Sequence, residues 1–182
     1  MIEAEGVRLR RAKVDDVDFL LGLLGDAEVE PYLAAVSARD RPALLEEIER
    51  SEQEPDEFGR LLIEVEEEGA WERAGTMRFE VRNRRSRIAS LGGLAVDPAF
   101  RGRRLGDTAA RLVQRHLIRE LGYHRLELEI YGFNERAIAH AERVGFVREG
   151  VKRRAYLRNG EWVDGVLFGL IREDLEEVSA PR

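Results

Sequence analysis

Arg101-Gly102-Arg103-Arg104-Leu105-Gly106 follows an apolar run at 88–96 and leads into a helical pattern, so the local order is strand, short loop, helix. The start of a helix exposes unpaired backbone N–H groups and carries the positive end of the helix dipole, which favours anions. Glycine lets the backbone approach a phosphate because it has no Cβ, and arginine can bind phosphate oxygens bidentately. The stretch therefore predicts a site for a phosphorylated ligand.

Two common phosphate motifs do not match this stretch. A Walker loop needs Gly-Lys-Ser/Thr, whereas the only lysines of the chain are Lys13 and Lys152. The dinucleotide fingerprint GxGxxG has a different glycine spacing and follows the first strand of a βαβ unit. Taken alone, the hexapeptide is equally compatible with a plain strand–turn–helix corner whose arginines are solvated.

The composition indicates one globular domain spanning 1–182, with a core at about 7–174. The chain has 182 residues, of which 43% are hydrophobic and 36% charged, and its net charge is −6. This acidic balance argues against general nucleic-acid binding, and no apolar run reaches the roughly 20 residues of a transmembrane helix. The acidic start lacks the apolar core of a signal peptide. We therefore expect a cytoplasmic protein with no membrane or nucleic-acid partner.

Metal and thiol chemistry are not expected either. The chain contains no cysteine, which excludes disulfides, thiolate metal sites and a cysteine nucleophile. Its three histidines lack the spacing of metal ligands.

Hydrophobic periodicity predicts a mixed α/β (mixed α+β) domain, an antiparallel meander followed by β-α-β-α and a closing hairpin. Asp40 is an expected N-cap, with Pro42 tolerated in the first turn of its helix, and Asn159-Gly160 is a strong hairpin-turn signal. The expected strands are 7–10, 61–65, 74–81, 88–96, 125–131, 146–157 and 162–171, and the expected helices are 15–24, 41–50, 105–121 and 134–144.

A second motif occupies residues 134–146, which read Asn-Glu-Arg-Ala-Ile-Ala-His-Ala-Glu-Arg-Val-Gly-Phe. Asn134 is a good helix N-cap because its side chain can accept hydrogen bonds from free backbone N–H groups. Gly145-Phe146 would end the helix and return a large hydrophobic side chain to the core. On the residues alone, a capping role for Asn134 and nothing more stays open.

Together the two motifs resemble the GCN5-related N-acetyltransferase (GNAT) family. Its pyrophosphate loop reads Gln/Arg-x-x-Gly-x-Gly/Ala, so Arg101 and Gly106 match, whereas Arg104 replaces the middle glycine. The second motif is similar to the family's Asn-x-x-Ala-x-x-x-Tyr-x-x-x-Gly-Phe, with Ala141 in place of the tyrosine. The segment 148–174 is similar to the branch that acetylates ribosomal-protein N-termini, polyamines and similar amines. The resemblance covers roughly 7–174 and implies a central mixed sheet of about seven strands with flanking helices.

The resemblance implies acetyl-CoA as the acetyl donor. In the family, two parallel strands splay apart in mid-sheet, and the pantetheine arm pairs with the backbone of the fourth strand. Gly92-Gly93 in the strand at 88–96 favours a bulge or a close backbone approach. The expected cofactor-binding residues are Leu94, Ala95, Val96, Arg101, Gly102, Arg103, Arg104, Leu105, Gly106, Asp107, Asn134 and Arg143, with Arg136 as a further candidate for the phosphates.

The catalytic groups are less defined, because Ala141 stands where the family has its tyrosine. Glu80, on the preceding strand, is the candidate base, and Tyr156 is the candidate acid. A solvent-facing Glu80 stays open, as does catalysis by positioning and a water chain alone. In the family the acceptor site lies between the first two helices, here about 26–36, and the closing hairpin. Glu28, Glu30 and Tyr32 are therefore the candidates for contacting a cationic amine.

The leading hypothesis is an acetyl-CoA-dependent N-acetyltransferase that acts on a primary amine by direct attack on the thioester. A protein N-terminus, a polyamine and a small-molecule amine all stay open as acceptors, and so does a homodimer. The first alternative is a catalytically silent acyl-CoA-binding or interaction domain with the same fold, favoured by Arg104 and Ala141. The second is a phosphate-binding regulatory domain for another nucleotide.

Overall fold

The strands form one mixed sheet of eight, in the order β1-β2-β3-β4-β5-β6-β8-β7. The computed structural model describes residues 1–4, 6–33 and 40–177. Every neighbouring pair is antiparallel except β5 and β6, which are parallel. The expected mixed sheet is confirmed, and β1 is the strand that the periodicity did not predict. The strands are β1 (Ile2–Ala4), β2 (Val7–Arg11), β3 (Phe58–Glu67), β4 (Ala70–Asn83), β5 (Ile88–Val96), β6 (Arg125–Tyr131), β7 (Val147–Arg158) and β8 (Glu161–Ile171).

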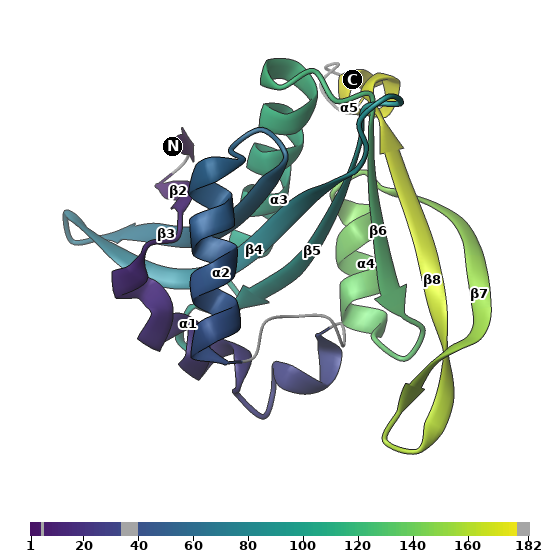
Figure 1. Ribbon diagram of the computed structural model, residues 1–182, viewed down its shortest axis with the longest axis horizontal. Helices are drawn as coiled ribbons and strands as arrows, with labels where there is room; N and C mark the ends of the chain where they lie inside the picture. Colours follow the sequence, from purple (N-terminus) through teal and green to yellow (C-terminus); the bar gives the residue numbers. More distant parts are fainter. Residues whose placement is uncertain (5, 34–39, 178–182) are drawn as a thin grey trace.

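Helices lie on both faces of the sheet (Figure 1). Helices α1 (Val17–Leu24) and α2 (Arg41–Gln53) cover one face, and α3 (Leu105–Arg115) and α4 (Glu135–Arg143) lie on the other. A short helix α5 (Arg172–Glu177) follows β8, and 3-10 turns occupy Val14–Asp16, Glu30–Tyr32 and Pro98–Phe100. Within the described ranges no helix is long and apolar enough to cross a membrane.

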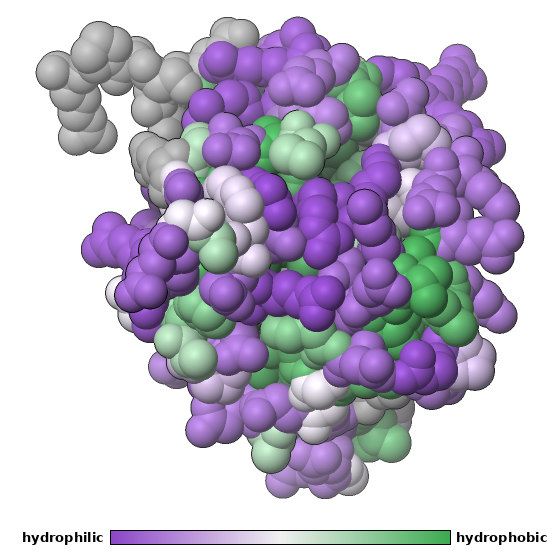
Figure 2. All heavy atoms as spheres, turned by 90° about the vertical axis from the view of Figure 1, so that its left-hand side faces the viewer, coloured by the Kyte–Doolittle hydropathy of each residue, from purple (hydrophilic) through white to green (hydrophobic). Residues whose placement is uncertain are grey.

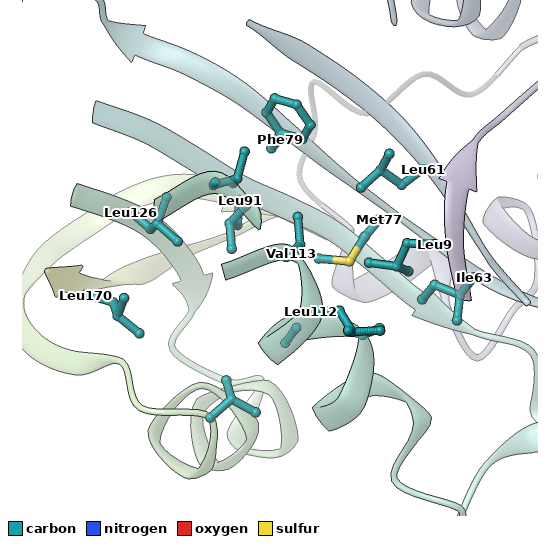
Figure 3. Packing of buried hydrophobic residues seen from close by; sticks show 14 of the residues in the cluster. Leu9, Leu61, Ile63, Met77, Phe79, Leu91, Leu112, Val113, Leu126 and Leu170 are labelled. Atoms are coloured by element: carbon teal, nitrogen blue, oxygen red, sulfur yellow. The ribbon is translucent and has the colours of Figure 1, made fainter. Parts of the chain in front are cut away.

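Alternation along the strands divides the core between the two faces, because successive side chains of a strand point to opposite sides. Leu61 and Ile63 of β3 belong to the larger cluster, beneath α3 and α4, whereas Leu62 between them packs with α1 and α2. Figure 3 shows the larger cluster, in which Leu112 and Val113 of α3 meet strand residues. The side of the molecule seen in Figure 2 is mostly hydrophilic, as expected for a highly charged surface.

Both predicted helix caps are present. Asp40 accepts a hydrogen bond from the Ala43 amide at 2.9 Å, and Asn134 accepts one from the Ala137 amide at 3.1 Å. The helix expected at 105–121 changes character near its end: its last turn, His116–Glu120, is a π-helix. These local features fix where α2 and α4 begin and where the regular part of α3 ends.

Strands β5 and β6 separate after only three residue pairs. Pairing joins Ile88–Ser90 to Arg125–Glu127, and no further pair between the two strands follows within the described chain. Strand β5 continues to Val96 and stays bonded to β4 on its other side. Gly93, at a φ of +61°, lies where the β4–β5 register shifts, so the expected bulge is confirmed. In Figure 1 the ribbons of β5 and β6 diverge beyond this point, and the region between their ends is called the notch below.

Candidate active site

The loop between β5 and α3 presents a row of unpaired backbone N–H groups beside this notch. Gly102 has a φ of +82° and Arg104 a φ of +57°, so the chain turns sharply before the helix begins. The amides of 102–106 donate no hydrogen bond to the part of the chain that the structure describes. Consecutive free amides at a helix start form a concave anion site. The local geometry therefore agrees with the phosphate site predicted from the sequence.

Arg104 shows why the family motif has a glycine at this position. It is the N-cap residue of α3 and adopts the left-handed conformation, with a φ of 57° and a ψ of 23°. That conformation costs a non-glycine residue roughly 1–2 kcal/mol. The substitution therefore raises the energy of the loop without preventing its turn.

Gly106 sits where α3, β5 and α4 converge. A Cβ at this position would lie 3.6 Å from Leu94 Cδ2, 3.7 Å from His140 Cε1 and 3.9 Å from Val96 Cγ2. These are ordinary contact distances, so alanine would fit, whereas a long side chain would enter the space between β5 and α4. The predicted cofactor residues Leu94, Val96 and Gly106 are thus brought together.

Asp107, predicted to bind the cofactor, makes hydrogen bonds within the protein through both its amide and its carboxylate. Its amide donates to Arg104 O at 2.9 Å, so it is not one of the free loop amides. Its buried carboxylate accepts hydrogen bonds from Arg143 Nε at 2.7 Å, Arg143 Nη2 at 2.9 Å and His140 Nδ1 at 2.9 Å. The Arg143 hydrogen bonds lower the pKa of Asp107 to about 2. Asp107 therefore ties the first turn of α3 to α4.

His140 is the member of this cluster that the sequence reasoning missed. Burial lowers the pKa of its imidazole, although the hydrogen bond to Asp107 raises it. His140 precedes Arg143 by three positions on α4, a spacing that places two side chains on one helix face. That spacing was the available signal. Ala141, at the family's tyrosine position, is fully buried in the larger core cluster.

Two of the predicted loop arginines are paired with carboxylates. Arg101 forms an ion pair with Glu28, which precedes the 3-10 turn Glu30–Tyr32. Arg103 pairs with Glu67 and lies over the ring of Phe100, 5.4 Å from its centroid. A predicted cofactor residue, Arg101, therefore meets a predicted acceptor residue, Glu28.

The predicted acceptor segment contacts the region beyond β6. The ring of Tyr32 lies 6.0 Å from that of Phe133, which stacks on Tyr131 at 5.5 Å. Arg158, near the turn of the β7–β8 hairpin, donates to Pro31 O at 2.9 Å. The segment at 30–33 thus contacts both the β6–α4 turn and the closing hairpin, and its part in an acceptor site stays a prediction. Residues 34–36 of the predicted acceptor loop lie outside the described residues.

The two catalytic candidates lie on separate strands. Glu80 of β4 is opposite Ser90, the last β5 residue paired with β6, and its carboxylate lies 2.8 Å from Arg50 Nη1. Tyr156 belongs to β7, and the sheet order places β5, β6 and β8 between it and β4. The structure therefore does not join Glu80 and Tyr156 into one acid–base pair.

Tyr156 has another carboxylate partner, Glu129 of β6. Its hydroxyl donates to Glu129 Oε1 at 2.7 Å, and Lys152 Nζ donates to Glu129 Oε2 at 2.7 Å. Burial raises the pKa of Tyr156, and the hydrogen bond to Glu129 raises it further. A Cβ on Gly165 would overlap Glu129 Oε1, so this glycine makes room for the pair. Glu129 was not predicted, although its alternation with apolar residues on β6 was a usable signal.

Comparison with known proteins supports a family assignment. A family model described as an acetyltransferase (GNAT) domain matches residues 7–147. The chain is 34% identical over 83 residues to an uncharacterized prophage-derived N-acetyltransferase, YokL, of Bacillus subtilis, covering 46% of this chain and 47% of that protein. It is 30% identical over 97 residues to the L-amino acid N-acetyltransferase AaaT of Escherichia coli, covering 53% and 59%. The chain thus spans about half the length of the curated relatives it matches.

Solved structures show the same fold. Spermidine N-acetyltransferase from Vibrio cholerae, in complex with CoA and spermine, has a TM-score of 0.81 at 18% identity and covers 94% of this chain and 98% of that one. A crystal structure of a putative acetyltransferase has a TM-score of 0.75 at 26% identity, covering 97% and 88%. Because the family model spans most of the chain, this protein belongs to the GNAT acetyltransferase family.

Proposed function

We propose that this protein is an N-acetyltransferase that transfers an acetyl group from acetyl-CoA to a primary amine. The observation that carries the proposal is the row of free amides at 102–106 next to the unpaired edge of β5. These two features suit the two chemically different parts of the cofactor, a pyrophosphate and an amide-containing arm. The family assignment supports the same reading.

The residues around the notch fit acetyl-CoA. The amides of 102–106 would hold the pyrophosphate, and the backbone of Leu94 to Val96 would pair with the pantetheine arm. Asn134 caps α4 with its side-chain oxygen, which leaves its side-chain nitrogen to donate to the cofactor. Arg104 and Arg136 stay candidates for the phosphates. Arg101 and Arg143 already form ion pairs with Glu28 and Asp107, so either would have to bind the phosphates in addition to its carboxylate or give up that ion pair.

When bound, acetyl-CoA supplies a thioester whose carbonyl carbon the amine nitrogen attacks, so that a C–N bond forms, the C–S bond breaks and the sulfur takes a proton. The acceptor ammonium loses one proton before the attack and another as the amide forms, and one of the two ends in solvent. An unpaired β5 N–H would donate to the carbonyl oxygen as it gains charge. Holding the two reactants in place supplies much of the remaining rate gain.

In this proposal Tyr156 is the general acid and Glu80 is the general base. The Tyr156 phenol is protonated near neutral pH and so has a proton to supply, although its raised pKa makes it a weaker acid than an ordinary tyrosine. Glu80 stays the candidate base, held beside Ser90 by Arg50. The homodimer and the cytoplasmic location stay predictions.

The acceptor class is the open part of the proposal. Among the proteins similar to this chain, one is named for spermidine and another for L-amino acids. A polyamine presents only cationic groups, whereas an amino acid also presents a carboxylate. Charge near the notch can therefore distinguish the two classes.

The test is release of CoA thiol from acetyl-CoA in the presence of amines, polyamines, amino acids and N-terminal peptides. Turnover with any one class would establish the activity. Binding of acetyl-CoA without turnover across this panel would favour the silent acyl-CoA-binding domain, to which the buried Ala141 points.

A further inference from the structure

Two arginines on neighbouring strands converge on one carboxylate. Arg60 of β3 and Arg78 of β4 are direct cross-strand partners. Arg60 shares its strand face with Leu62, the face beneath α2. Arg60 Nε donates to Glu47 Oε2 at 2.7 Å, and Arg78 Nη1 donates to Glu47 Oε1 at 3.3 Å. Like charges placed directly opposite each other weaken a sheet, so this pairing requires a reason.

The cluster carries an excess positive charge in a largely dry environment. The exposed fraction of the side chain is 1% for Arg60, 15% for Glu47 and 18% for Arg78. Two guanidinium groups therefore face one carboxylate. The other carboxylate on this face of β4, Glu80, is held by Arg50. Within the described chain, the electrostatic partners of Arg60 are Glu47, which is attractive, and Arg78, which is repulsive.

One nitrogen of Arg60 is left without a partner. Arg60 Nη1 is buried and makes no hydrogen bond with any described residue. An unpaired N–H on a buried charged group is unfavourable, and native proteins generally retain one only where something else binds it. Arg60 Nη1 is therefore the atom of the cluster at which an anionic ligand would bind.

The unpaired nitrogen lies beside Gly93 of β5. A Cβ on Gly93 would lie 3.6 Å from Arg60 Nη1 and 3.6 Å from Arg78 Cγ. Gly93 is the bulge residue of β5, beyond the last β5–β6 pair. The absence of a side chain there leaves space between the guanidinium and the strand that the proposed function assigns to the cofactor. Arg78, which is partly exposed, borders the same space.

We propose that Arg60 and Arg78 form a subsite for a carboxylate of the acceptor, so that the preferred acceptor is an amine that also carries a carboxylate, such as a free amino acid. This inference rests on the proposed acetyltransferase function. A carboxylate matches the planar donors of a guanidinium and would neutralise the excess charge. A polyamine would bring further positive charge to the same place and be disfavoured.

The first experiment compares matched acceptors with the wild-type protein. Free L-amino acids, the corresponding L-amino acid amides and spermidine are assayed by thiol release from acetyl-CoA. We expect kcat/KM for the acids to exceed that for the amides by about tenfold or more, the size of a charge-assisted hydrogen bond. Turnover of amides and spermidine at equal or higher efficiency would overturn the carboxylate subsite and leave the acetyltransferase standing. No turnover of any amine would overturn both.

The second experiment follows the acid-to-amide ratio of kcat/KM in variants. The ratio is internal to each preparation, so a partly unfolded sample does not alter it. We expect Arg78→Gln to lower the ratio about tenfold, Arg78→Lys to restore part of it, and Glu47→Gln to raise it. Arg84→Gln is the matched control, because Arg84 lies in the turn after β4 and pairs with Glu57. An unchanged ratio in Arg78→Gln would overturn the proposal.

Discussion

His140 Nδ1 lies 2.9 Å from Asp107 Oδ1, and this contact joins α4 to the first turn of α3. The two residues are 33 positions apart: Asp107 directly follows the first sequence motif, and His140 lies in the second. Arg143 binds the same carboxylate through two nitrogens. This charged cluster therefore lies directly behind the free amides of 102–106, and two of the predictions concern it.

Asp107→Asn should destabilise the protein by about 2 kcal/mol at neutral pH. The reason is that folding lowers the pKa of Asp107 from the ordinary value of 3.8 to about 2. A lowered carboxyl pKa gives stability that is present above the unfolded value and lost as the pH falls through the folded value. The difference between wild type and variant should therefore shrink as the pH falls from about 4 toward 2. Urea unfolding at a series of pH values measures it, with Glu120→Gln, an exposed partner of His116, as control. An equal loss in both variants would contradict the assignment.

His140→Gln should flatten the pH dependence of stability below pH 6.5. Burial lowers the pKa of His140 from 6.5 in the native state. Above 6.5 the imidazole is neutral in both states, whereas just below it the unfolded chain takes up a proton that the native state does not. Wild type should thus lose stability as the pH falls through this window, and the variant should lose less. His116→Gln is the control, and matching slopes in wild type and His140→Gln would count against a buried neutral imidazole.

Arg104→Gly should be more stable than Arg104→Ala by about 1 kcal/mol, because only glycine adopts the left-handed conformation without strain. Both variants remove the same charge and differ only in the Cβ, so their comparison isolates the backbone. Chemical denaturation of the two variants measures the difference. Equal stability would mean that the loop relaxes out of the left-handed conformation.

Gly106→Glu should abolish acetyl-CoA binding while the protein remains folded. The new side chain would enter the space bordered by Leu94 and His140, and its negative charge would oppose the phosphates. Gly106→Ala is the matched control, because a Cβ meets only ordinary contacts there. Isothermal titration with acetyl-CoA measures both. Unchanged affinity in a folded Gly106→Glu protein would remove the loop from the cofactor site.

Tyr156→Phe should reduce kcat on the order of 10²-fold if the phenol supplies the proton to the sulfur. Wild type should lose activity at alkaline pH as the phenol ionises, above the ordinary tyrosine value because its pKa is raised. The variant should lack that alkaline limb. Tyr123→Phe serves as control, because the Tyr123 hydroxyl donates to Asp56 O and takes no part in the proposed site. An alkaline limb that persists in Tyr156→Phe would transfer the role to another group.

Much of the fold followed from local patterns. Strands β5 and β6 were predicted with their observed bounds. The apolar run of β5 ends at Asp97-Pro98, and the alternating pattern of β6 ends before Gly132. Asp40 and Asn134 were recognised as caps because capping depends on residues within one turn. Strand β1 was missed because three residues are too few to show a period.

The sequence could predict only part of the candidate site, because some of its residues act through partners far away along the chain. The loop residues 101–106 are consecutive, so a common role for them could be predicted from the sequence alone. The sequence could not identify the partners of Glu129 and Arg60, because Tyr156 and Glu47 lie 27 and 13 positions away from them. Asp107 is predicted to bind the cofactor, and only the tertiary structure shows that its carboxylate also bonds to α4.

The sequence by itself determined the strand–loop–helix corner at 88–115, the helix that Asn134 caps, and the family to which the chain belongs. These depend on backbone preferences and on side chains within a few positions of one another, which a linear chain displays directly. Only the tertiary structure decided that β5 leaves β6 after three pairs and that Arg60 and Arg78 meet beside Gly93. Those relationships depend on strand order and register, which follow from how all the hydrophobic faces pack together rather than from any one segment.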